Sequence, residues 1–353
     1  MRDQRSPYRR RLGALLVGAA IIAGGAAYLH HIDWHTTLAV IAGAAPAALA
    51  LAYGLHVVSL LAKAGVWWVC LRAIGRPAFT IVLRLTFLGS ALNSLLVANS
   101  GEVGRVMLIS RLTGMRISSA FATVAAERLI NICGFVMVLI AAAWWMPLPA
   151  PMGRWMLGGA GIIVMTVVVI GLRRGGRAVS IARPPRRKPR RVVRAMCIHL
   201  RRTLLAVRRI GTPARLASAG AMTLVDWTCQ LASYHLVARA AHLPIPLSGS
   251  VLALLAVNLG LVVRVTPGNV GIFEVAYAAV AVSQGAPPAA ALGVGMLIHL
   301  VQDLPTIVLG LASGHSLKRS AGVTRALVDL TAGMSATGPC RLDKLPPAGG
   351  TIP

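Results

Sequence analysis

Long apolar segments recur along the chain and alternate with short polar or basic ones. Six of them are long enough for a transmembrane helix, which needs about 20 apolar residues: 12–29, 46–71, 117–145, 155–172, 217–241 and 286–311. Soluble domains carry about 25% charged residues, whereas this chain of 353 residues carries 13% and is 56% hydrophobic. The sequence therefore predicts an all-α polytopic membrane protein with about six full transmembrane helices.

Two further apolar segments, 81–109 and 247–283, are interrupted by Gly, Pro and charged residues. The first contains NSLLVANSGEVGR at 93–105, and the second contains VNLGLVVRVTPGNVGIFE at 257–274. Pro removes a backbone donor and Gly weakens a helix, while unpaired backbone groups in hydrocarbon cost several kcal/mol each. Each interruption must therefore be enclosed by protein or line a polar cavity. Paired interruptions of this kind are typical of transporter binding sites.

Basic residues assign the sides of the membrane, because cytoplasmic loops are enriched in Lys and Arg. Residues 1–11, the linker 173–215 and the start of the tail 313–353 are basic, which predicts cytoplasmic termini and a tail without stable structure. The aromatic pair Trp67 and Trp68, followed by arginines, is interpreted as an interfacial belt at the cytoplasmic end of 46–71.

With these sides assigned, segment 81–109 begins and ends in the cytoplasm, and segment 247–283 begins and ends outside. The predicted fold is an inverted-topology repeat with two opposed re-entrant hairpins, one in the first membrane half (12–145) and one in the second (155–172 with 217–312). The alternative is about eight ordinary helices with Gly/Pro kinks, because short apolar runs are ambiguous by periodicity.

The formal charge of +27 does not require a nucleic-acid partner. Much of it lies outside the apolar segments, where topology and attraction to anionic lipid explain it. The five cysteines are scattered without a CxxC pair, so neither a disulfide framework nor a metal site is indicated. We predict no cofactor, no nucleic acid, and anionic membrane lipids as partners.

Five of the nine acidic residues fall within apolar segments, where a charge needs a partner or neutralisation: Glu102, Glu127, Asp226, Glu274 and Asp303. The available partners are Arg105, Arg128 and Arg264, and pairing with Arg105 or Arg264 would satisfy Glu102 and Glu274. Glu127 and Arg128 are adjacent, face different directions and each need another partner. His299 and Asp303 share a helix face, so this pair is either a proton relay or a core hydrogen bond.

The two interruptions are the predicted substrate-binding site, and their residue types suit an anionic group. Amide groups at a half-helix start suit a phosphate, glycines allow close backbone approach, and arginines add charge-assisted contacts. Glu102 and Glu274 would meet near the midplane and either hold the arginines or titrate. The predicted binding residues are Asn93, Gly101, Glu102, Gly104, Arg105, Asn258, Arg264, Pro267, Gly268, Gly271 and Glu274, with Glu127, Arg128, Asp226, His299 and Asp303 in structural or relay roles.

These motifs resemble the lysylphosphatidylglycerol synthase transmembrane-region family, also called flippase-like. The resemblance covers about residues 10–312 and rests on four motifs: WWVCLRAIG at 67–75, Asn93 with SGEVGR at 100–105, the Glu127-Arg128 pair and TPGNVGIFE at 266–274. Ser100 departs from the family, which more often has proline near the first interruption. We therefore leave the backbone conformation at that point open.

The resemblance implies lipid translocation or handling in the bacterial inner membrane. The soluble aminoacyl-transferase domain of two-domain members has no counterpart in this sequence, which argues against lysyl transfer. Free-standing members are associated with hopanoid, polyprenyl-linked glycan and glycolipid pathways, so the cargo stays open. Two alternatives remain: an integral-membrane lipid-modifying enzyme, and a non-catalytic partner of a lipid or glycolipid biosynthesis enzyme.

Overall fold

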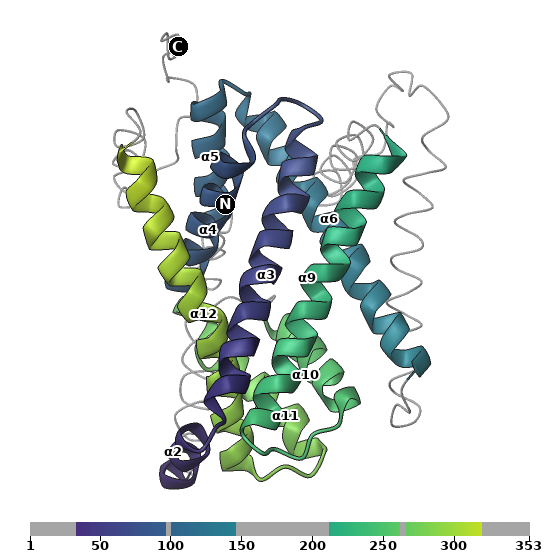
Figure 1. Cartoon of the computed structure of the whole chain (residues 1–353), viewed down its shortest axis with the longest axis vertical. Coiled ribbons are helices and arrows are strands. Elements are labelled where there is room, and N and C mark those ends of the chain that lie inside the picture. The colour runs from purple at the N-terminus through teal and green to yellow at the C-terminus, as the bar shows by residue number, and fades with distance from the viewer. Residues whose placement is uncertain (1–32, 97–99, 146–211, 262–265, 320–353) are drawn as a thin grey trace, which may run out of the picture. The chain divides into compact units, whose positions relative to one another are not determined.

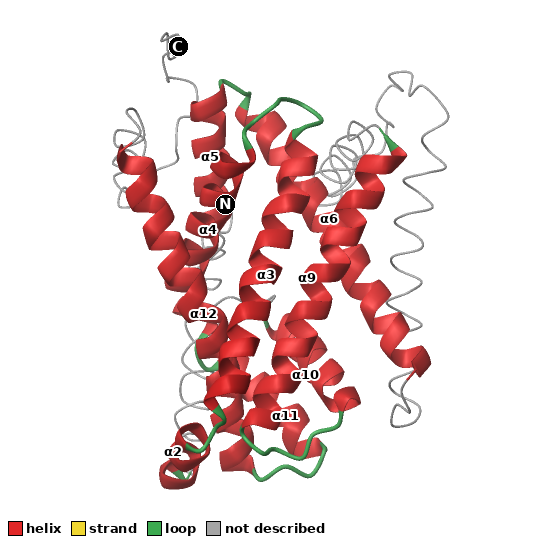
Figure 2. Ribbon diagram, viewed as in Figure 1, coloured by secondary structure: helices red, strands yellow, loops and turns green. Residues whose placement is uncertain are grey.

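The structure is a computed structural model, and it describes residues 33–96, 100–145, 212–261 and 266–319. Within these ranges every element is a helix or a turn, and no strand occurs (Figure 2). The all-helical prediction is therefore confirmed for the described part of the chain. The predicted segments 12–29 and 155–172, the basic N-terminus and nearly all of the basic linker lie outside it.

Four of the predicted transmembrane segments and both interrupted segments appear as helices in the expected order (Figure 1). The elements are α2 (Trp34–Ala42), α3 (Pro46–Leu71), α4 (Phe79–Leu95), α5 (Ser100–Thr113), α6 (Ile117–Trp145), α9 (Pro213–Ala240), α10 (Leu247–Gly260), the 3-10 turn η1 (Pro267–Asn269), α11 (Ile272–Ser283) and α12 (Pro288–Arg319).

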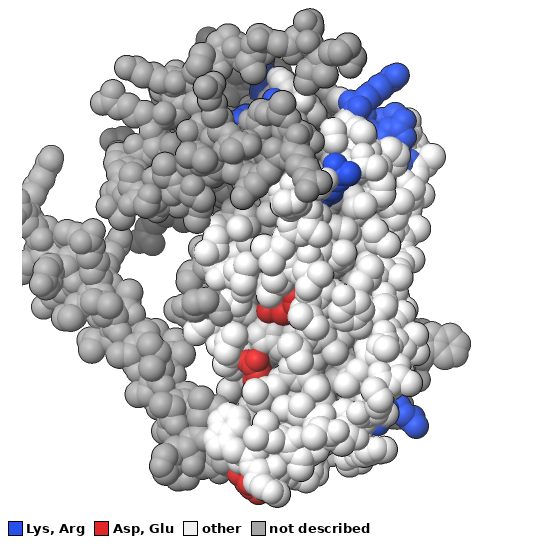
Figure 3. All heavy atoms as spheres, turned by 60° about the vertical axis from the view of Figure 1, so that its left-hand side comes forward, with Lys and Arg blue, Asp and Glu red and all other residues white. Residues whose placement is uncertain are grey.

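Among the described residues, three helices are long and apolar enough to cross a membrane: Pro46–Leu71 in α3, Ile117–Ala142 in α6 and Pro288–Leu317 in α12. Helix α9 has 28 residues but is less apolar, with Thr223, Asp226 and Gln230 in its middle. On the face in Figure 3, uncharged side chains cover most of the described surface. Such a surface is expected of helices that contact lipid.

Local sequence explains where the helices begin. Proline stands at the first position of α3, α9 and α12, where its missing N–H costs no helical hydrogen bond. Before α2, the exposed Asp33 carboxylate accepts hydrogen bonds from the Thr36 hydroxyl (2.5 Å) and from the amides of Thr36 and His35. These bonds lower the pKa of Asp33, because they stabilise its ionised form.

The chain forms two compact units, which we describe separately. The first comprises Met1–Tyr53, Leu96–Ala98 and Ser233–Gln302, and the second comprises Gly54–Leu95, Asn99–Ala232 and Asp303–Pro353. The first unit therefore holds α2, α10, η1 and α11, and the second holds α4, α5 and α6. Helices α3, α9 and α12 each contribute to both units.

In the second unit, the first interruption separates α4 from α5, which pack against each other. The contact is closest at two glycines: a Cβ on Gly101 would overlap the carbonyl oxygen of Gly89. Asn93 Oδ1 accepts a hydrogen bond from the Gly101 amide (2.9 Å) and so fixes the start of α5 to the end of α4. Gly101 therefore permits helix contact, and its predicted role of letting the backbone approach a phosphate stays a prediction.

In the first unit, the second interruption is a left-handed turn between α10 and α11. Gly268, Asn269 and Gly271 have φ angles of 64°, 60° and 89°, a region that favours glycine and tolerates asparagine. The Thr266 hydroxyl donates to the Val270 carbonyl (2.9 Å) across this turn. The interpretation of TPGNVG as a helix interruption is therefore confirmed.

Two details of the sequence interpretation are wrong. Trp67 is not interfacial but completely buried in the core of the second unit, with Leu71, Leu85 and Ile109. Residues 313–319, predicted to belong to a tail without stable structure, are part of α12, which continues as a helix to Arg319. Buried apolar side chains explain both: Trp67 packs in the core, and Leu317 lies in the same cluster.

The glycine contact predicts different effects for two neighbouring substitutions. Gly101→Ala should destabilise the protein by about 1–3 kcal/mol, a typical cost of overpacking, because its methyl group would overlap the Gly89 carbonyl. In Gly104→Ala the nearest new contact is Leu92 Cδ1 at an ordinary 3.6 Å, so stability should change little. Unfolding of the purified variants in detergent measures both, and equal destabilisation would contradict the contact.

Candidate functional site

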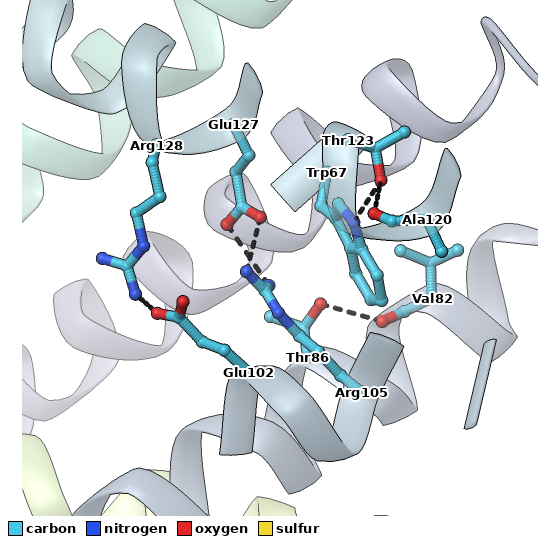
Figure 4. Close-up of polar contacts among 9 residues, drawn as sticks. All are labelled: Trp67, Val82, Thr86, Glu102, Arg105, Ala120, Thr123, Glu127 and Arg128. Atoms are coloured by element: carbon cyan, nitrogen blue, oxygen red, sulfur yellow. Dashed lines mark hydrogen bonds and ion pairs between the residues drawn. The ribbon is translucent and has the colours of Figure 1, made fainter. Parts of the chain in front are cut away.

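A charged cluster lies in the second unit where α3, α5 and α6 meet (Figure 4). Its centre is a buried ion pair between Arg105 on α5 and Glu127 on α6. Arg105 Nη2 donates to Glu127 Oε2 at 2.6 Å and Nη1 donates to Oε1 at 3.3 Å. The side chains are only 5% and 2% exposed, so this pair fastens the start of α5 to α6.

The indole of Trp67 completes the surroundings of Arg105. The guanidinium carbon lies 4.6 Å from the centre of the Trp67 ring, a favourable cation–π distance. Trp67 Nε1 donates to the Thr123 hydroxyl on α6 at 3.2 Å, which fixes the ring. Arg105 Nε is buried and has no hydrogen-bond partner among the described residues, so one donor of the guanidinium is unused.

A second ion pair joins the same two helices and is more accessible. Arg128 on α6 pairs with Glu102 in the first turn of α5, with side chains 44% and 18% exposed. Glu102 therefore pairs with Arg128, and the expected pairing with Arg105 is wrong. Adjacent positions on a helix point in different directions, so Glu127 and Arg128 reach two different residues of α5.

Lys63 on α3 adds a third basic side chain, which the sequence interpretation missed. It is partly exposed and interacts electrostatically with Asp226, Glu127, Arg105 and Arg128. The described contacts include no hydrogen bond or ion pair of its ammonium group. The sequence did contain an indication of it. A lysine inside an apolar segment is costly to bury in a membrane and is therefore a candidate functional residue.

Asp226 on α9 is buried near Lys63 and is held by hydrogen bonds. Its Oδ1 accepts from the Ser59 hydroxyl on α3 at 2.5 Å and from Gln230 Nε2 at 2.8 Å. On α12, Asp303 Oδ1 accepts a hydrogen bond from the Ser94 hydroxyl on α4 at 2.9 Å. Asp226 and Asp303 thus each have a polar partner on another helix.

In the first unit, Glu274 has two partners that the sequence did not indicate. Its Oε2 accepts from the Gly271 amide at the start of α11, and its Oε1 lies 2.6 Å from His299 Nδ1 on α12. Phe273 stacks on the His299 ring with centroids 4.5 Å apart. His299 therefore pairs with Glu274, and a pairing with Asp303 is not needed to satisfy it.

The remaining predicted residues have local roles or lie outside the described ranges. Asn258 Nδ2 donates to the Leu254 carbonyl one turn earlier in α10 at 2.8 Å. Pro267 opens η1, and Gly104 lies buried in α5. Arg264 lies outside the described residues.

The prediction that both interruptions form one site stays a prediction. Glu102 belongs to the second unit and Glu274 to the first. Within the second unit the structure brings together Glu102, Arg105, Glu127 and Arg128, which the sequence named, with Lys63 and Trp67, whose roles it missed. Within the first unit it brings together Gly271, Glu274 and His299.

Fold and cluster define a class: a multi-pass helical membrane protein in which a buried ion pair joins the helix after the first interruption to its neighbour α6. The chain matches the family described as "Lysylphosphatidylglycerol synthase TM region" over residues 15–310. It therefore belongs to this family, as the sequence motifs predicted.

One curated relative is a protein of Haloferax volcanii named "Glycosyltransferase AglD". It is 26% identical over 326 residues, which cover 82% of this chain and 52% of the relative. The chain thus spans about half the length of that relative. Together with the family, this similarity indicates a function related to membrane lipids.

The buried ion pair predicts a specific pattern of stability. Glu127→Gln leaves the buried Arg105 charge without its counterion, which should cost about 3–5 kcal/mol. Arg105→Gln should cost a similar amount, and the double variant less than the sum of the two. Glu102→Gln is the control, because it removes the partner of a side chain that is 44% exposed. Unfolding in detergent measures all four variants, and strictly additive effects would contradict the pair.

Proposed function

We propose that the protein translocates an amphipathic lipid with an anionic headgroup between the leaflets of the bacterial cytoplasmic membrane. The observation that carries this proposal is the cluster of Lys63, Arg105 and Arg128 beside the interruption between α4 and α5. Phosphate is well matched by basic side chains that converge in a partly dehydrated site.

The three basic residues have different roles in this proposal. Arg105 is buried and already bonded to Glu127, so it supports the site without receiving the headgroup. Arg128 is accessible and Lys63 has only longer-range electrostatic neighbours. We assign the headgroup to Lys63 and Arg128, since an ammonium group in low dielectric gains most from an added anion.

Glu102 limits how tightly the headgroup binds. It holds Arg128 in the described structure, so an arriving phosphate competes with a carboxylate for the same guanidinium. A site that must release its lipid on the other side benefits from such competition, because a lipid that binds too tightly does not leave.

Helix lengths support re-entrant hairpins. Helices α4 and α5 have 17 and 14 residues, and α10 and α11 have 14 and 12. At about 1.5 Å per residue, each is shorter than the roughly 30 Å hydrocarbon core. We propose that the two hairpins enter from opposite faces as an inverted repeat, with both chain termini in the cytoplasm.

A second candidate function follows from the name of the relative. If this chain handles a lipid-linked sugar, its cluster would position the lipid phosphate for a glycosyl-transferring partner enzyme. The relative carries the name of such an enzyme and is about twice as long as the matched region.

Leaflet exchange in proteoliposomes tests the proposal. The purified protein should exchange labelled phosphatidylglycerol faster than labelled phosphatidylcholine. Lys63→Gln and Arg128→Gln should each slow exchange by about tenfold, since a charge-assisted contact contributes about 1.5–3 kcal/mol. Arg72→Gln is the control, because Arg72 lies over Trp68 outside the cluster.

The other outcomes separate the alternatives. A new lipid product would identify an enzyme. Absence of both exchange and product by correctly folded protein would contradict translocation and favour the accessory role. Equal exchange in Lys63→Gln and Arg72→Gln would place the headgroup site away from the cluster.

A further inference from the structure

A line of polar side chains follows one side of α3 through the second unit. The residues are His56, Ser59, Lys63 and Trp67, at spacings of three, four and four. At 3.6 residues per turn they fall within about 80° of the helix circumference. We call these four residues the α3 polar line. The rest of α3 is almost entirely apolar.

Three members of the α3 polar line contact three different neighbouring helices. His56 Nε2 lies 3.1 Å from the Thr306 hydroxyl on α12, and Ser59 donates to Asp226 on α9 at 2.5 Å. Trp67 donates to Thr123 on α6. Between them, Lys63 interacts electrostatically with Asp226 and Glu127, so polar or charged side chains recur along about three turns of α3.

The opposite side of α3 has the character of a lipid-facing surface. Val58 and Leu61 are 42% and 40% exposed, whereas His56 and Ser59 are 8% and 2% exposed. The polar residues therefore do not result from an exposed, hydrated helix face. They lie inside the bundle, where each needs a polar partner.

Stability alone does not account for this arrangement. Buried polar networks usually stabilise less than well-packed apolar side chains, and incompletely bonded ones are unfavourable. His56 Nδ1, near one end of the line, is buried and has no hydrogen-bond partner in the described part of the chain, and the same holds for Arg105 Nε beside Trp67 at the other end. Unused hydrogen-bonding atoms thus occur at both ends of the α3 polar line.

We infer that the α3 polar line forms part of the path along which a lipid headgroup crosses the bilayer, with Lys63 as its central anion-binding position. At about 1.5 Å per residue the line covers roughly half of the 30 Å hydrocarbon core. As the headgroup passes, it takes the place of the present polar partners of His56, Ser59 and Lys63. The acyl chains stay in the surrounding lipid. In the described structure these side chains lie inside the bundle against neighbouring helices. The headgroup can therefore pass only if α3 separates from α9 and α12 along this side. This inference rests on the proposed function and adds a route to it.

Cysteine accessibility during lipid exchange tests the path. In a background without the native cysteines, Ser59→Cys is a conservative change on the path, and Val58→Cys is its neighbour on the opposite side. A charged, membrane-impermeant thiosulfonate should modify Ser59→Cys about tenfold faster than Val58→Cys while phosphatidylglycerol is being exchanged, because thiolates form in water. Modification should then stop exchange.

His56→Cys and Leu61→Cys provide a second pair with the same expected difference. If the cysteine variants exchange phosphatidylglycerol normally but positions 59 and 56 stay unmodified, the path is wrong and the translocation proposal stands. If a small uncharged thiol reagent reacts but the charged one does not, the line admits water and protons only, which also overturns a headgroup path. If the unmodified protein shows no exchange, the translocation proposal fails and the path fails with it.

Discussion

The ion pair between Arg105 and Glu127 is the interaction on which the second unit depends. An arginine buried among apolar helices requires an opposite charge at hydrogen-bond distance, since neither lipid nor apolar side chains can stabilise it. The ion pair joins α5 to α6. The Trp67 ring over the Arg105 guanidinium also ties α3 to these two helices. The remaining charges are arranged around this centre: Arg128 holds the first turn of α5 through Glu102, and Lys63 lies close enough to interact with all of them except Glu102.

Much of the helical framework could be predicted from the sequence. It depends on the lengths of the apolar segments and on the Pro, Gly and aromatic residues that mark their ends. The bounds of α3 and α6 agree with the apolar segments 46–71 and 117–145, the first opened by proline and the second closed by a tryptophan pair. The first interruption was located by Gly and polar residues and the second by Gly and Pro. At the second, the left-handed φ angles of Gly268 and Gly271 give the physical reason.

The partners of the charged residues could not be predicted, because they depend on which helix faces meet. Glu102 and Arg105 are near neighbours in sequence, yet each pairs with a residue of α6 more than 20 positions away. Lys63 was overlooked because a single lysine leaves the surrounding segment apolar enough to span a membrane. Trp67 was misjudged because an aromatic pair beside arginines is typical of an interface, while a core position for one member depends on the tertiary packing.

Membership of the lysylphosphatidylglycerol synthase transmembrane-region family gives the cluster its lipid context, and the central claim is that this cluster binds an anionic headgroup. Native mass spectrometry of the purified protein with equimolar phosphatidylglycerol and phosphatidylcholine measures this most directly. The protein should retain phosphatidylglycerol preferentially, and Lys63→Gln should lose this preference while it stays folded. Equal retention of the two lipids by the unmodified protein, or an unchanged preference in Lys63→Gln, would contradict it.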